Sequence, residues 1–324
     1  MPEMTKTHID QALTNISVAY IQEENAFIAD KVFPIVPVQR QSDLYFVYDK
    51  ETFFLDEAAE RGNGEESKGG DYNVEQSEPY FCRVYAYHKD LTDRDRLNMD
   101  NPLNADRDAA KFVTQKLLLK RERDFVETFL KEGKWGVDVE GVESNPTGNQ
   151  CIKWNKPLSN IISDIRKYKR EMLENTGFEP NTLVLSRGAY DALCDHEDIL
   201  DRIKYTQKGQ VTKDLIASLL EVPNVHVSNA VYKTQKGEEG QMSFVSKNNA
   251  LLCYVTNMPS LQTPSAGYIF AWTGLEGSGA YANRMVRIPT PLKGIGAERI
   301  EGEMAYDQRQ IAKDMGIFFK NIVD

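Results

Sequence analysis

Residues 298–316, with the sequence ERIEGEMAYDQRQIAKDMG, are the stretch that most constrains the fold of this 324-residue chain. Within it, Ile300, Gly302, Met304 and Tyr306 alternate with Glu301, Glu303 and Ala305. An alternation with a period of two is typical of a β-strand that buries one of its faces. The stretch therefore predicts a strand, within a strand-rich tail that runs from residue 285 to 323.

A second informative stretch, NTLVLSRGAYDAL at residues 181–193, joins an apolar run to a helix start. Residues 182–185 predict a strand, and Ser186 can cap a helix that continues through Leu193. Further helices are predicted at 195–203 and 213–220, and further strands at 225–231, 242–245 and 250–255. This alternation of strands and helices indicates a mixed α/β unit.

Two longer helices precede this unit. The apolar residues between Asn101 and Lys131 largely keep helical spacing, with Pro102 suited to a first turn and Gly133 to a C-terminal stop. A second helix is predicted from 158 to 175, followed by Gly177. The first of these is long enough to act as a spine for the fold.

Charged side chains crowd the second half of the spine helix. Lys116, Lys120, Arg121 and Arg123 stand among Glu122, Asp124 and Glu127. Mixed charges at helical spacing favour a solvated helix face over a nucleic-acid-binding surface.

Two segments are predicted to be irregular because they are rich in turn-forming residues. Residues 133–148 contain Gly, Asn and Pro, and residues 259–279 contain Gly, Ser and Pro. Neither is assigned a helix or a strand.

The first fifty residues predict an extended arm. Pro34 and Pro37 interrupt the apolar residues between Phe27 and Val38, and they are incompatible with a helix there. The arm leads into a strand at 44–48, where aromatic and β-branched residues favour a pleated conformation. An apolar arm of this kind needs a surface to lie against.

Residues 51–89 predict a long hairpin. Thr52–Leu55 is expected to form one strand and the alternating stretch Tyr80–Tyr87 the other. The glycine-rich tip between them, residues 61–70, has few groups to bury. Because a two-stranded ribbon is marginal in water unless it packs on something, we expect a neighbouring molecule to hold this tip.

Composition excludes several classes of protein. The 39 Lys+Arg against 49 Asp+Glu give a net charge of −10, which disfavours sequence-specific nucleic-acid binding. No apolar run reaches the length of a membrane-spanning helix, and no secretory signal is expected at the N-terminus. The four scattered cysteines suggest buried, reduced thiols.

No catalytic, cofactor or metal site is predicted. Cys194 and His196 lack a second closely spaced pair of the kind that structural zinc uses. Aspartates between Asp90 and Asp108 are interleaved with arginines, which favours a mixed-charge surface over a calcium loop. The four histidines accompany no nucleophile elbow, so nucleophilic catalysis is not indicated.

Arm, hairpin, spine helix, α/β unit and returning strand follow one another in an order that resembles the major capsid protein of tailed double-stranded DNA bacteriophages. This is the Hong Kong ninety-seven capsid fold, which encapsulin shells share. The resemblance is most specific at residues 181–193 and 298–316. It implies an α+β fold in five segments: an N-terminal arm (1–50), an extended hairpin loop (51–89), a peripheral domain with the spine helix (90–180), an α/β axial domain (181–282) and a return to the peripheral domain (283–324).

The resemblance also implies a structural function without catalysis. The chain is expected to assemble with copies of itself into pentamers and hexamers of an icosahedral head around phage double-stranded DNA. Contacts between subunits are expected at Phe27 and Phe33 of the arm, at Arg61, Lys68 and Asp71 of the hairpin, and at Gly277 and Tyr281 near the capsomer centre.

The implied partners are a separate scaffolding protein, a portal, possible decoration proteins, and packaged DNA held nonspecifically on the inner face, with no membrane. The protein is expected in the virion, after assembly in the host bacterial cytoplasm. No covalent crosslink through Lys68 is predicted, because no partner Asn or catalytic acid is identifiable.

Two other functions stay open at this stage. An encapsulin-like nanocompartment shares the fold and would enclose a cargo enzyme, although the long hairpin and arm favour the phage capsid. A soluble α/β enzyme would need a clustered acid, base and nucleophile in a pocket, which the sequence does not suggest.

Overall fold

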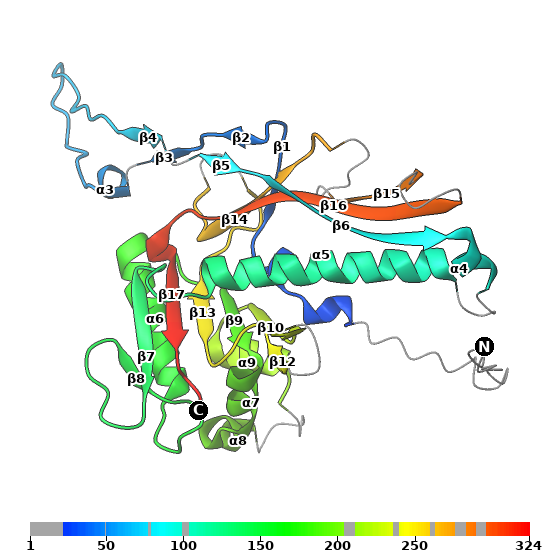
Figure 1. The fold of residues 1–324 in the computed structure, drawn as a ribbon. Helices are drawn as coiled ribbons and strands as arrows, with labels where there is room; N and C mark the ends of the chain where they lie inside the picture. The colour runs from blue at the N-terminus through cyan, green and yellow to red at the C-terminus, as the bar shows by residue number, and fades with distance from the viewer. Residues whose placement is uncertain are drawn as a thin grey trace, which may run out of the picture.

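The computed structural model describes residues 22–48, 50–76, 79–98, 104–203, 211–235, 240–259, 263–275, 283–289 and 296–324. The long helix α5 (Ala105–Phe129) separates two β-sheets (Figure 1). A five-stranded sheet covers one side of this helix, and a six-stranded sheet with its own helices lies on the other side, beside the C-terminal half of α5. The spine helix predicted from the sequence is confirmed.

The five-stranded sheet is organised around β16. Along one edge of β16 (Ala297–Gln310), β15 (Asn283–Pro289) pairs with residues 298–304 and β14 (Gly267–Trp272) with residues 306–310. β6 (Arg83–Thr92) pairs with the other edge of β16, and β1 (Ile35–Val38) pairs with the free edge of β14. β1 runs parallel to β14, and the other pairs are antiparallel. The predicted strand within 298–316 is confirmed, with Ile300, Met304 and Tyr306 buried.

Helix α5 lies close to β16 at a glycine. A Cβ on Gly302 would come within 2.7 Å of the Val113 side chain and 2.8 Å of that of Leu117. Beyond this point Ile300 packs against Ala105 and Ala109. The absence of a side chain at 302 therefore permits the close approach of helix and strand.

The six-stranded sheet has the order β10 (Asn224–Ser228), β9 (Thr182–Ser186), β13 (Ala250–Cys253), β17 (Gly316–Lys320), β7 (Val137–Val142) and β8 (Gln150–Ile152). Successive residues of its central strands face opposite sides. Leu183, Leu185 and Phe319 pack under the covering helices, while Val184 and Phe318 belong to the core shared with α5. Both faces of the sheet are thus buried.

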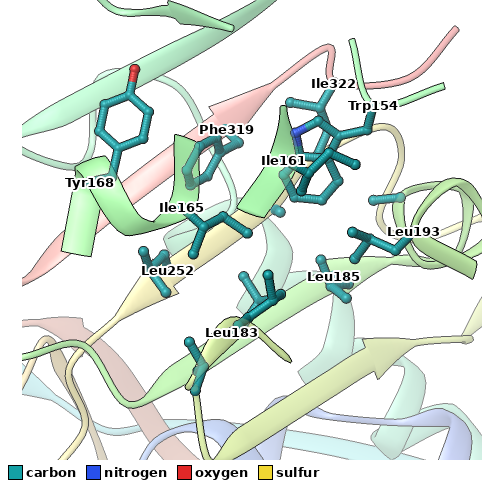
Figure 2. Packing of buried hydrophobic residues seen from close by; sticks show 14 of the residues in the cluster. Trp154, Ile161, Ile165, Tyr168, Leu183, Leu185, Leu193, Leu252, Phe319 and Ile322 are labelled. Carbon is teal, nitrogen blue, oxygen red and sulfur yellow. The ribbon is translucent and has the colours of Figure 1, made fainter. Parts of the chain in front are cut away.

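Four helices accompany this sheet: α6 (Ile161–Thr176), α7 (Arg187–Asp195), α8 (Glu197–Ile203) and α9 (Lys213–Leu220). Figure 2 shows Ile165 and Tyr168 of α6 above the sheet, with Phe319 and Trp154 beside them. The helix starts and stops follow the predictions. Ser186 accepts a hydrogen bond from the Ala189 N–H, and Gly177 ends α6 with φ 74°.

The remaining elements are short. They are η1 (Glu24–Ala26), α2 (Ala29–Val32), β2 (Ser42–Asp43), β3 (Phe46–Tyr48), α3 (Lys50–Phe53), β4 (Val74–Gln76), β5 (Tyr80–Phe81), α4 (Asp93–Leu97), β11 (Val231–Lys233), β12 (Met242–Phe244) and η3 (Lys313–Met315).

Four local predictions are wrong. Residues 133–148 contain β7, and residues 259–279 contain β14, because both find neighbouring strands to pair with despite their Gly-rich surroundings. Thr52–Leu55 is not a strand: α3 begins at Lys50, and 46–48 takes the pairing with β4 instead. In the described part of the arm, residues 29–32 form the helical turn α2, which ends before Pro34.

The two sheets also cut across the predicted segments. β14 falls in the predicted axial segment 181–282 but belongs to the five-stranded sheet. β7, β8 and α6 fall in the predicted peripheral segment, and β17 in the returning segment, yet all pack in or on the six-stranded sheet. Strand pairing between residues far apart in the sequence, which segment composition does not reveal, decides these memberships.

Candidate assembly surfaces

The hairpin loop is anchored at its base by two antiparallel strand pairs, β2 with β5 and β3 with β4. Beside them the Cys82 N–H donates a hydrogen bond to the Gln41 carbonyl at 2.8 Å, and the Gln41 side-chain amide donates to the Cys82 carbonyl at 3.0 Å. The Tyr80 ring stacks on Phe270, with centroids 4.5 Å apart. The base of the loop is therefore fixed to the edge of the five-stranded sheet.

Beyond this base, every residue from 53 to 74 is exposed, and Figure 1 shows the loop standing away from the body. Arg61, Lys68 and Asp71, the predicted contacts of the hairpin, all lie on this tip. The segment 54–73, called here the acidic tip, carries six carboxylates and two basic residues. Its carboxylates are Asp56, Glu57, Glu60, Glu65, Glu66 and Asp71.

Helix α3 ties one side of the loop to the body. Lys50 forms an ion pair with Asp314 of η3. The Phe54 ring lies against the backbone of Gly177, so close that a Cβ there would come within 2.9 Å of it. Phe54 nevertheless stays 63% exposed, and Phe53 is 61% exposed. The two rings thus leave a large aromatic surface exposed in the single chain.

A groove of about 540 Å³ lies between the C-terminal half of α5 and strands β5, β6 and β16. We call it the basic groove, because of the charges that line it. Phe81 and Tyr85 form part of its wall. Its charged lining residues are Arg83, Lys131, Lys134, Arg309, Asp124, Glu127 and Asp307.

Each carboxylate of the basic groove already has a cationic partner. Asp124 pairs with Lys120, Glu127 with Arg123, and Asp307 with Arg309. Arg83, Lys131 and Lys134 have no ion-pair partner among the residues the structure describes. The groove therefore presents three uncompensated positive charges next to exposed aromatic surface. The sequence alone does not indicate this groove, since its residues come from separate parts of the chain that meet only in the fold.

Phe27 and Phe33 are the predicted contacts of the arm. Both are only 2% exposed in the single chain. The Phe33 ring lies 4.4 Å from that of Phe129 and 6.0 Å from that of Phe125, both of α5. In the single chain the apolar arm therefore covers this chain's own core, and a contact of these two residues with another subunit stays a prediction.

Gly277 and Tyr281 lie outside the described residues. The strands on either side of them, β14 and β15, both belong to the five-stranded sheet. The far end of the six-stranded sheet is instead formed by α8 and the loop before α6, where Leu158 and Leu200 are 76% and 45% exposed.

A buried Ser–His pair lies beneath this end, but its hydrogen bonds are those of a structural contact and not of a catalytic pair. Ser159 Oγ and His196 Nε2 are 2.6 Å apart, and the Asp198 N–H donates to His196 Nδ1. Because Nδ1 is an acceptor, the proton of a neutral imidazole resides on Nε2 and is donated to Ser159. The histidine in this form cannot accept the serine proton, which general-base activation would require.

The cysteine thiols are likewise placed against reactivity. Burial raises the pKa of both Cys82 and Cys151 to about 12, so neither forms a thiolate near neutral pH. Within the described ranges, no group of three or more His, Cys, Asp or Glu side chains is arranged to hold a metal ion. Of the described helices, none combines the length and the hydropathy that crossing a membrane requires.

Comparison with known sequences gives a consistent result. A family model described as phage major capsid protein E matches residues 144–266. The chain is 24% identical to the major capsid protein of Burkholderia phage BcepMu over 259 residues, 76% of each protein. It is also 24% identical to the major capsid protein of Pseudomonas phage JBD67 over 322 residues, 97% of each.

Solved structures show the same fold. A phage-related protein from Bordetella bronchiseptica matches with a TM-score of 0.70 and 22% identity, over 93% of this chain and 94% of that one. The mature capsid of bacteriophage PhiM1 matches with a TM-score of 0.58 and 11% identity, over 99% and 91%. The SrpI encapsulin of Synechococcus elongatus matches with a TM-score of 0.52 and 15% identity, over 97% and 96%. The predicted resemblance is thereby confirmed: the chain has the α+β fold of tailed-phage major capsid proteins and encapsulins, and the sequences it resembles are phage major capsid proteins.

Proposed function

We propose that this chain is a major capsid protein, a structural subunit that assembles with copies of itself into the shell of a phage head. The observation that carries the proposal is the exposed loop 53–74, which is anchored at its base and has no core of its own. Loops of this length without secondary structure are uncommon in compact domains and usually either have a function, such as binding, or serve as linkers. The relatives described above are phage capsid proteins, which favours this function over an encapsulin compartment or a soluble enzyme.

We further propose that the acidic tip of one subunit lies in the basic groove of a neighbour. The tip carries a net charge of −4 from six acidic and two basic residues. The groove carries Arg83, Lys131 and Lys134 without ion-pair partners among the described residues, and Phe81 beside them is 49% exposed. Complementary charge steers association and fixes register, while the aromatic surfaces supply apolar contact.

The finer organisation follows from the same proposal. Subunits form pentamers and hexamers, and the particle encloses double-stranded DNA. The five segments named above act as arm, loop, peripheral and axial parts, except that β14 joins the peripheral part and β7, β8, α6 and β17 join the axial part. A scaffolding protein and a portal take part in assembly, and decoration proteins bind to the outside of the shell. Assembly takes place in the host cytoplasm, and the protein has a structural and not a catalytic role. The net charge of −10 keeps the inner face from holding the packaged DNA tightly.

Negative-stain electron microscopy with size-exclusion chromatography tests the function. The purified chain, expressed with and without the products of its neighbouring genes, is expected to form closed shells or capsomer-sized rings. Shells filled with an enzyme and lacking DNA would support the encapsulin alternative. A monomer or dimer under all these conditions would rule out self-assembly as its role.

Charge reversal in the basic groove tests the contact. The double variant Lys131→Glu/Lys134→Glu is expected to raise the protein concentration needed for shell formation about tenfold, since replacing attraction by repulsion weakens each contact by about 1.4 kcal/mol in total. The difference should shrink as salt is added, because screening weakens exposed charge pairs. Light scattering across a protein dilution series measures the onset.

Two further variants make this test specific. Lys111→Glu/Lys247→Glu, which changes the charge equally at exposed lysines outside the groove, is the matched control and should assemble nearly as the parent does. Adding Glu65→Lys/Glu66→Lys to the groove variant exchanges the charges and should restore assembly. If the swap gives no recovery, the tip binds elsewhere, even if shells still form.

A further inference from the structure

The segment 22–33 of the arm lies along α5, on the side of this helix that faces away from the five-stranded sheet. The Gln22 side-chain amide donates to the Val231 carbonyl at 2.6 Å and accepts from the Val231 N–H at 2.9 Å. The Asn229 N–H donates to the Ala26 carbonyl. The segment thus runs beside the end of β10 and the start of β11 before Phe33 enters the core.

At the centre of this contact lies Glu122 of α5, whose side chain is completely buried. Its Oε2 accepts hydrogen bonds from the backbone N–H groups of Ile28 and Ala29, both at 2.9 Å. Its Oε1 accepts from the Ser228 hydroxyl of β10 at 3.0 Å. One carboxyl group therefore joins the arm, the spine helix and the six-stranded sheet. The interpretation of this part of α5 as a solvated face is wrong for both Arg121 and Glu122, which are buried.

Other charged groups stand close to this junction. The ion pair between Arg121 of α5 and Asp30 of α2, 3.1 Å long, flanks Glu122. His226 of β10, two residues before Ser228, has a pKa lowered by burial and by Lys213 of α9 and Lys31 of α2. Among the described residues, no cation forms an ion pair with Glu122 itself. Its charge is compensated by three hydrogen-bond donors.

Burying a carboxylate without a cation is costly even when it is hydrogen-bonded. Accordingly, burial raises the pKa of Glu122, with a smaller contribution from Asp30, against the lowering effect of the three donors. The neutral acid can keep the geometry, since its proton can be donated from Oε1 to Ser228 while Oε2 still accepts from Ile28 and Ala29. Protonation therefore removes the cost of the buried charge without removing the contacts to the arm.

We propose that Glu122 is a proton-controlled latch for the arm, which holds residues 22–33 firmly when its carboxyl is neutral and loosely when it is ionised. The direction of this pH dependence follows from the linkage between proton binding and closure of the arm. A carboxyl whose pKa is raised in the closed state stabilises that state most at low pH, and the stabilisation is lost as the pH rises through the raised value. The arm should accordingly open more often as the pH increases.

Hydrogen exchange at the Ile28 and Ala29 amides, measured on the full unassembled chain, tests the latch. After correction for intrinsic exchange, protection in the parent is expected to fall by up to about tenfold per pH unit between about pH 4.3 and the raised pKa, and then to level off. In Glu122→Gln, the protection of these two amides should not change with pH, because the Gln side-chain oxygen can accept from them and its NH₂ can donate to Ser228. Glu122→Leu should reduce protection at least about tenfold throughout, since it leaves two buried donors unpaired.

The matched control is Glu127→Gln, which removes the exposed carboxylate five residues further along the same helix and should keep the parent's pH dependence. His226 is present in every variant, so its titration cancels in the comparison. Equal pH dependence in the parent and Glu122→Gln would overturn the latch. The test reports on an intrachain contact and so stands or falls independently of whether the chain forms shells.

Discussion

Deleting residues 56–71 and joining the ends with a short Gly-Ser link is expected to give a folded chain that forms no closed shells. The removed residues are all exposed, so they contribute little to the fold. The Phe53 and Tyr72 rings lie 5.6 Å apart, which brings the two new ends close together. Under the proposed function, the deletion takes from every subunit the surface it places on its neighbour.

The measurement is size-exclusion chromatography with negative-stain microscopy, at concentrations where the parent assembles. The free energy of urea unfolding of the unassembled deletion variant should differ from that of the parent by less than about 1 kcal/mol. A length-matched loop that replaces 56–71 with Gly and Ser serves as the control and should also fail to assemble, since the side chains are what the neighbour binds. Closed shells from either variant would show that the tip is dispensable.

Replacing Phe319 of β17 with alanine is expected to destabilise the unassembled chain by about 3–5 kcal/mol. Its side chain is fully buried, with ring centroids 5.9 Å from Trp154 and 5.4 Å from Tyr168 (Figure 2). These neighbours come from a loop and from α6, which cannot both move in to fill the space. The variant therefore loses stability for two reasons: less apolar surface is buried, and a large cavity is left in the core.

Urea unfolding measures this loss. The matched control is Phe244→Ala on β12, where the side chain is 41% exposed and the expected cost is below about 1 kcal/mol. If the two variants unfold at the same urea concentration, the core of the six-stranded sheet is not arranged as described.

Helices with a clear apolar period were predictable almost to the residue. The predicted helix at 213–220 coincides with α9, and α6 lies within a few residues of the predicted 158–175, because periodicity and local caps act within the segment itself. β7 was missed although Val137 and Val139 alternate with acidic residues. Its glycine, Gly141, reflects a distant contact: a Cβ there would come within 2.2 Å of the Asn321 carbonyl oxygen.

The assembly surfaces were less predictable, for a different reason. An apolar arm shows from its composition that it must be covered, but not which molecule covers it, and Phe33 turned out to lie on Phe129 of the same chain. The exposed positions of Arg61, Lys68 and Asp71 follow from a polar tip with nothing to bury. The basic groove depends on Lys131, Lys134 and Arg83 meeting in space, and pairing of β6 with β16 brings this about.

The position of β17 has a consequence during synthesis. This strand, residues 316–320, lies between β13 and β7 in the interior of the six-stranded sheet, and its neighbours are made long before it emerges from the ribosome. The sheet consequently closes only after translation has passed residue 320, since contacts of such long sequence separation cannot form earlier. A chain that ends before residue 316 lacks this strand, so β13 and β7 lose the strand that joins them and the six-stranded sheet is divided in two.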